Sequence, residues 1–282
     1  MDNLKINDDE IRIVGNNPHH NEPQEKKKEN RWLYPIAAIL LVCIAVFFLT
    51  LKRPHSDALE NQSIINVNSE SKERTSYTII SDTIINNINL RCFTPVGAKP
   101  KLVVGLLKEI PQEYILGAMA ADFGKYGNEY QVVGSFVING EMLSHSKSKY
   151  GFCSIINDTL TIGNDLSTSL FEQAVENNGD FFRQYALVAN GKPQNNPPIY
   201  KDALRRSLCI LHDGRICVID TDMEVSLNSF AAALCDFGVK DAISLMGSGA
   251  AVRWAVDKAG RRYIAGADEY EFPDVANYIV WE

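Results

Sequence analysis

The sequence predicts an α+β domain, a mixed and strand-rich sheet with a few packing helices, preceded by a single transmembrane helix. Three observations predict it: short runs rich in Ile, Val and Cys between turn residues, an amphipathic helix pattern, and one long apolar run near the N-terminus. They divide the chain into a disordered cytoplasmic tail at 1–31, a membrane span at 32–51, a flexible linker at 52–75 and an extracytoplasmic domain at 76–282.

The apolar run at 32–51 reads WLYPIAAILLVCIAVFFLTL and has about the length of a helix that spans a bilayer. A buried helix of a soluble domain normally keeps one polar face, and this run has none. More basic residues precede the run than follow it, which favours a cytoplasmic N-terminus and a periplasmic or extracellular domain. We therefore expect a single-pass protein of the cell membrane, with the lipid bilayer as one partner.

The regions around the run are polar. Residues 1–31 mix both signs of charge, and the region after the run is rich in Ser, Asn and Glu, a composition typical of disordered segments and tethers. The net charge of −7 argues against nucleic acid as a partner, because phosphate backbones attract basic surfaces.

Strands are expected to outnumber helices in the domain. A helix is expected near 170–176, whereas the pattern at 113–123 fits a helix and a strand equally well. Strands are expected at 77–80, 101–106, 131–138, 152–156, 185–188 and 278–281.

The segment 205–251 has the clearest local pattern. Strand-like runs at 207–211 and 215–220 flank His212-Asp213-Gly214, where glycine permits the positive φ of a tight hairpin. A helix is expected at 227–237, because its apolar residues recur at helical spacing between a serine N-cap and Gly238.

A strand expected at 242–246 then leads into Gly247, Ser248 and Gly249. A glycine loop after a buried strand either brings backbone N–H groups close to a ligand or simply makes a tight turn.

Five cysteines follow the apolar run, an odd number without CxxC spacing. Cys209 and Cys217 face each other if the hairpin turn has three residues, so a disulfide is one alternative. Small buried thiols are the other, and both remain open.

The order of these motifs resembles the C-terminal core of the phosphodiester glycosidase family. Arg206-Ser207, Asp213-Gly214, the FGVKDA run at 237–242 and the LMGSGA run at 245–250 occupy the places of its Arg-Thr pair, its DG hairpin, its "LG…DA" segment and its Asp-Gly-Gly-Gly-Ser loop. Upstream, AMAADF at 118–123 takes the place of an Asn-Gly-Gly-Phe-Phe motif, and the resemblance covers roughly residues 100–255.

Three positions depart from the family pattern: Ala120 replaces an Asn, Met246 replaces an Asp, and Ala250 replaces a Ser. The resemblance implies a domain that acts on or recognises glycosyl-phosphodiester or glycan ligands of the cell envelope, with weak or altered hydrolase activity. The alternative is a catalytically inactive glycan-binding or scaffold protein. In both cases the expected partner is a glycan or sugar-phosphate ligand.

The resemblance also nominates site residues. Arg206 matches the family's arginine and is the expected phosphate clamp, since a guanidinium binds pairs of oxygens. Asp122 and Glu141 are the candidate carboxyl groups for catalysis. The remaining candidate ligand-binding residues are Arg205, Asp180, Arg183, Gly247, Ser248 and Gly249. No cluster has metal-ligand spacing, so a divalent cation could bind only through scattered carboxylates, and no cofactor is expected.

Overall fold

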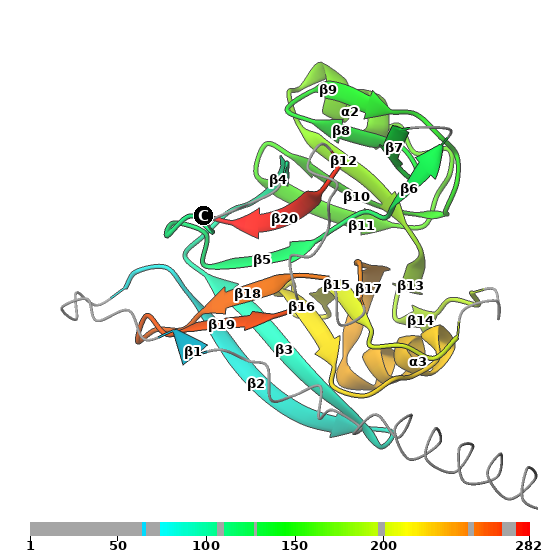
Figure 1. Cartoon of the computed structure of the whole chain (residues 1–282). Helices are drawn as coiled ribbons and strands as arrows, with labels where there is room; N and C mark the ends of the chain where they lie inside the picture. Colours follow the sequence, from blue (N-terminus) through cyan, green and yellow to red (C-terminus); the bar gives the residue numbers. More distant parts are fainter. Residues whose placement is uncertain are drawn as a thin grey trace, which may run out of the picture. The chain divides into compact units, whose positions relative to one another are not determined.

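Antiparallel strands make up most of the described chain (Figure 1). The computed structural model describes residues 64–65, 74–105, 110–126, 129–196, 201–247, 251–266 and 275–282. All of them belong to one unit, Asp57–Glu282.

A seven-stranded sheet contains the hairpin that the Asp213-Gly214 turn predicts. Its strand order is β14-β13-β17-β15-β16-β3-β2, and each neighbouring pair is antiparallel. The strands are β2 (Tyr77–Ile85), β3 (Ile88–Val96), β13 (Ala186–Ala189), β14 (Lys192–Pro193), β15 (Arg206–Leu211), β16 (Ile216–Thr221) and β17 (Val239–Ser244).

A six-stranded sheet combines strands from distant parts of the chain in the order β1-β19-β18-β5-β20-β4. Its strands are β1 (Ile64–Ile65), β4 (Pro100–Val104), β5 (Leu116–Met119), β18 (Arg253–Val256), β19 (Arg262–Ala265) and β20 (Asn277–Trp281). The C-terminal strand β20 lies between β4 and β5, so the end of the chain completes the middle of this sheet.

A five-stranded sheet has the order β11-β10-β12-β8-β9, and a separate hairpin pairs β6 with β7. Their strands are β6 (Phe123–Tyr126), β7 (Glu129–Val132), β8 (Phe136–Ile138), β9 (Glu141–Ser144), β10 (Gly151–Ile156), β11 (Thr159–Gly163) and β12 (Asp180–Gln184).

One hydrophobic core joins the three larger sheets. Phe93 and Leu208 from the seven-stranded sheet, Leu116 from the six-stranded sheet, and Phe136 and Phe182 from the five-stranded sheet belong to the same buried cluster. Helix α3 (Leu227–Phe237) packs on the other face of the seven-stranded sheet, and helix α2 (Leu170–Glu176) packs on the five-stranded sheet. The arrangement places segments far apart in sequence around one centre.

The caps of α3 confirm the sequence prediction. The Ser226 side chain accepts a hydrogen bond from the backbone N–H of Ser229, and Gly238 adopts the left-handed conformation with φ 101°. The helix expected near 170–176 is also confirmed, as α2.

The expected α+β class is wrong. The described chain is predominantly β, with two helices among its described residues. Several strands, such as β3 and β19, carry polar or charged residues that gave no clear strand pattern, and pairing with neighbouring strands stabilises them. The strand expected at 131–138 is broken into β7 and β8 at Gly134, which has φ 98° and leaves a Cβ only 3.1 Å from Arg183 Cβ.

The expectation of a single-pass membrane protein is also corrected. Across the part of the chain that the structure describes, no helix is both long and apolar enough to cross a bilayer; α3 has 11 residues, and a span needs about 20. The expected span at 32–51 and the expected tail at 1–31 lie outside the described residues, as does most of the expected linker.

Candidate functional site

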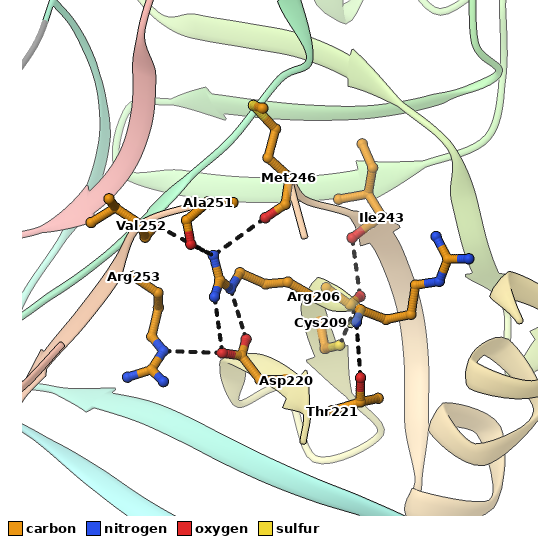
Figure 2. A network of polar contacts seen from close by, with 11 residues as sticks. Arg206, Cys209, Asp220, Thr221, Ile243, Met246, Ala251, Val252 and Arg253 are labelled. Atoms are coloured by element: carbon orange, nitrogen blue, oxygen red, sulfur yellow. Dashed lines mark hydrogen bonds and ion pairs between the residues drawn. The ribbon is translucent and has the colours of Figure 1, made fainter. Parts of the chain in front are cut away.

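Arg206 lies at the start of β15, with 6% of its side chain exposed, and forms a buried ion pair (Figure 2). Its Nε and Nη2 donate to the two carboxylate oxygens of Asp220 at 2.8 and 3.1 Å. Arg253 Nε donates to the same carboxylate at 3.0 Å from the six-stranded sheet. Asp220 therefore joins two sheets through charge-assisted hydrogen bonds.

The strand register extends this pair into a row of alternating charge. Arg206 lies opposite Asp220, Asp220 opposite Arg91, and Arg91 opposite Asp82, on four adjacent strands. The row is buried at Arg206 and exposed at Asp82, whose side chain is 64% accessible. Such cross-strand pairs of opposite charge hold the register of the sheet.

Burial raises the pKa of Asp220, but the Arg206 and Arg253 guanidinium groups outweigh this effect and hold the pKa below its ordinary value. Burial lowers the pKa of Arg253 to about 10, against the opposing attraction of Asp220. Both side chains therefore carry charge at neutral pH.

The third nitrogen of Arg206 holds the backbone on both sides of the glycine loop. Its Nη1 donates to the carbonyl of Met246 at 3.3 Å, of Ala251 at 2.9 Å and of Val252 at 3.3 Å. A Cβ at Gly247 would lie 2.5 Å from the carbonyl oxygen of Leu204, so only glycine fits there. Ser248 and Gly249 lie outside the described residues. Arg206 donates to protein acceptors here, which is the geometry of a positioning residue.

The two motif positions that depart from the family pattern lie side by side. The backbone N–H of Met246 donates to the carbonyl of Ala120 at 3.2 Å. Next to Ala120, the fully buried Asn277 side chain holds both the N–H and the carbonyl of Ala121, at 2.7 and 3.0 Å. The end of β5 and the end of β17 therefore meet at one fixed point.

A group of polar side chains surrounds this meeting point; we call Lys149, Asp122, Gln184, Tyr185 and Ser244 the Lys149 cluster. Lys149 Nζ donates to an Asp122 carboxylate oxygen and to Gln184 Oε1, the latter at 2.7 Å, and lies 5.1 Å from the Tyr185 ring centroid. Ser244 Oγ donates to Gln184 Oε1 at 3.4 Å.

The Lys149 cluster contacts the motif positions directly, because Gln184 Nε2 donates to the carbonyl of Ala120 at 3.5 Å. Only 5% of the Lys149 side chain is exposed, against 44% for Asp122. Burial lowers the pKa of Lys149, and the Asp122 carboxylate opposes this shift. A buried cation with a lowered pKa beside a solvent-accessible carboxylate is a typical feature of functional sites.

The backbone of Lys149 is also unusual. Its φ is 68°, in the left-handed region that residues other than Gly, Asn and Asp seldom occupy. Arg183 Nη1 donates to the carbonyl of the next residue, Tyr150, at 3.5 Å. A strained backbone at a buried charged residue is common at functional sites, where the surrounding structure stabilises it.

The other nominated residues lie away from the Lys149 cluster. The Asp180 carboxylate accepts hydrogen bonds from the backbone N–H groups of Leu102 and Asn139, at 2.8 and 2.9 Å, and burial raises its pKa against the effect of these bonds. Arg205 donates to the carbonyls of Val225 and Lys201. These contacts connect strands and loops.

Glu141 and Arg183 complete the list. Glu141 begins β9 and is exposed. The Arg183 guanidinium donates to the carbonyls of Asp165 and Leu166 as well as Tyr150. The structure therefore brings Asp122, Gly247 and Arg206 near the meeting point of β5 and β17, but not Glu141 or Asp180.

A surface cleft of about 370 Å³ lies elsewhere, and neither Arg206 nor Gly247 lines it. Its lining comes from the start of β2 and the turn between β18 and β19: Tyr77, Thr78, Ile79, Ile80, Asp257, Lys258, Ala259, Arg261 and Tyr263. Within the described ranges, no group of three or more His, Cys, Asp or Glu side chains is arranged to hold a metal ion.

Sequence reasoning missed Lys149, Gln184, Asp220 and Arg253. A signal for Asp220 existed, because a hairpin centred on Asp213 places residue 220 opposite residue 206. Lys149 had no such signal, since it lies 27 residues from Asp122 and 35 from Gln184.

Comparisons with known proteins find similarity in structure and not in sequence. No protein-family model matches the chain, and no curated protein sequence matches it. The catalytic domain of zebrafish N-acetylglucosamine-1-phosphodiester alpha-N-acetylglucosaminidase superposes with a TM-score of 0.52 at 14% identity, over 81% of this chain and 93% of that domain.

A hypothetical protein from Synechocystis superposes with a TM-score of 0.54 at 10% identity, over 73% of this chain and 62% of that chain. Identities this low establish structural similarity alone. The chain is thus a distant structural relative of a phosphodiester glycosidase domain, with which it shares the fold.

Proposed function

We propose that the domain binds a glycan or glycosyl-phosphate ligand at the Lys149 cluster and hydrolyses glycosyl phosphodiesters slowly or not at all. The observation that carries the proposal is the hydrogen bond between Met246 and Ala120, which brings both motif positions to the cluster. The shared fold with a phosphodiester glycosidase domain supports the ligand class.

The chemistry of the cluster suits recognition. The Lys149 ammonium offers a cation for an anionic group, and the Asp122 carboxylate accepts hydrogen bonds at the solvent-accessible side. Tyr150, the residue after Lys149, is 66% exposed, and a tyrosine offers a flat apolar face as well as a hydroxyl. A few polar groups beside an aromatic residue are typical of small-molecule sites.

The same cluster is poorly equipped for hydrolysis. Glycoside cleavage generally uses two carboxyl groups, about 5 to 9.5 Å apart, on either side of the scissile bond. The Lys149 cluster has one carboxylate, that of Asp122, and Lys149 donates to it. Ala120 and Met246 supply no carboxyl or amide side chain where the family pattern has Asn and Asp.

Binding and turnover should be measured on the same purified chain. Calorimetric titration with N-acetylglucosamine 1-phosphate tests binding, and release of N-acetylglucosamine from an N-acetylglucosamine-1-phosphodiester tests turnover. We expect measurable binding, little or no turnover, and at least tenfold weaker binding in Lys149→Met, since a lost charged contact costs about 1.5–3 kcal/mol.

Lys147→Met is the matched control, because Lys147 is an exposed lysine two residues away. It should bind as the unaltered protein does. Robust turnover by the unaltered protein, or equal binding by the Lys149→Met variant, would contradict the proposal.

A further inference from the structure

The Lys149–Asp122 ion pair is unevenly exposed. The ammonium end is buried, with 5% of the Lys149 side chain accessible, whereas 44% of the Asp122 side chain is accessible. The carboxylate therefore lies between the buried cation and the solvent.

The buried side of Lys149 is held firmly. Gln184, 1% exposed, accepts from Nζ and is itself tied to the Ala120 carbonyl and to Ser244. The Tyr185 ring lies 5.1 Å from Nζ, within the range of a cation–π contact. These contacts fix the position of the ammonium, so a partner can exchange only on the Asp122 side.

A buried ammonium needs a counter-ion. Removing its partner without replacement leaves an uncompensated charge in a poorly solvated place, which is strongly unfavourable. Replacing one anion with another preserves the charge balance, and the departing carboxylate returns to water at little cost because it is already half exposed.

We propose that Lys149 is the anion-binding residue of the site and that the anionic oxygens of a ligand, from a phosphate or carboxylate group, take the place of the Asp122 carboxylate. The inference rests on the proposed function and extends it. Asp122 is then a competitor of the ligand for Lys149, not a ligand-binding or catalytic group.

This assignment has an unusual consequence for mutagenesis. Asp122→Asn removes the competing charge and keeps the size of the side chain, so an anion should bind more tightly, by about tenfold. Removing a catalytic or ligand-binding carboxylate would instead weaken binding or leave it unchanged. The sign of the effect distinguishes the two roles.

The experiment titrates the purified full chain and its variants with inorganic phosphate, N-acetylglucosamine 1-phosphate and neutral N-acetylglucosamine at pH 7. We expect Asp122→Asn to bind both phosphates about tenfold more tightly and Lys149→Met to lose them. Lys147→Met should match the unaltered protein. Asp122→Ser provides a second test if the Asn variant folds poorly, and should also bind phosphate more tightly.

Equal or weaker phosphate binding by folded Asp122 variants overturns the inference, while sugar-phosphate binding that needs Lys149 still leaves the proposed function standing. Tighter inorganic phosphate binding by Asp122→Asn with no selectivity for the sugar phosphate supports the anion site and contradicts the proposed function. Absence of phosphate binding in every folded variant overturns both.

Discussion

At the scale of single residues, the Asp220 carboxylate is the counter-ion of two buried arginines, so neutralising it leaves Arg206 and Arg253 without one. We expect Asp220→Asn to lower the free energy of unfolding by about 3–5 kcal/mol, measured by urea denaturation at pH 7. Asp82→Asn is the control at the exposed end of the same row and should cost less than about 1 kcal/mol. Similar losses in the two variants would contradict this account.

The pKa of Asp220 makes the same effect depend on pH. Burial raises this pKa, but Arg206 and Arg253 hold it below the ordinary value of 3.8. A carboxyl group whose pKa is lower in the folded state stabilises the fold above the unfolded pKa, and this stability is lost as pH falls through the folded pKa. The stability difference between the unaltered protein and Asp220→Asn should therefore be constant above about pH 5 and shrink below pH 4. A difference that grows on acidification would be inconsistent with a lowered pKa.

At the scale of elements, strand β5 fits against β18 because Gly117 lies opposite Trp254. A Cβ at Gly117 would lie 2.1 Å from the indole, and Trp254 is fully buried with Nε1 donating to the Tyr114 carbonyl at 3.1 Å. We expect Gly117→Ala to destabilise the domain by about 1–3 kcal/mol or more, through overpacking.

A double-mutant cycle with Trp254→Phe checks the cause of that loss. The smaller ring relieves the clash, so the double variant should be more stable than the sum of the two single losses implies. Thermal and urea denaturation of the four proteins measure the coupling, and strictly additive losses would exclude the proposed contact.

At the scale of the whole molecule, the common core predicts that the three larger sheets unfold together. Phe182 of the five-stranded sheet belongs to the same buried cluster as Phe93 of the seven-stranded sheet and Leu116 of the six-stranded sheet. Separate cores would permit separate transitions, whereas a shared core favours a single cooperative one.

Two buried thiols report on this cooperativity. Burial raises the pKa of Cys153 in β10, and hydrogen bonding to Cys209 raises that of Cys217 in β16, so both are unreactive thiols in the folded protein. We expect iodoacetamide to label both at the same urea midpoint, as followed by peptide mass spectrometry at pH 8. Earlier labelling of Cys153 would show that the five-stranded sheet opens independently.

The features predicted correctly from sequence share a short range of interaction. The turn at Asp213-Gly214 and the caps of α3 at Ser226 and Gly238 depend on residues a few positions apart. Dihedral preferences and local hydrogen bonds act over that range, so a single sequence carries them.

The candidate site was predictable only in part. The motif order nominated the region of residues 120 and 246, and the structure joins these two positions by a hydrogen bond. The role of Arg206 differs from the expected phosphate clamp, because its partner Asp220 and the carbonyls it holds become neighbours only when two sheets pack together. A single sequence records no such packing.

Local order in this chain follows from the residues themselves, whereas its class and its chemistry follow from packing. The amphipathic pattern and caps were enough for α3, but strands such as β3 and β19 form because neighbouring strands satisfy their backbone groups. Likewise Lys149 is an ordinary lysine in sequence. It becomes a buried, strained cation with one exchangeable partner only where β5, β12 and β17 meet, since burial and charge are properties of three-dimensional surroundings.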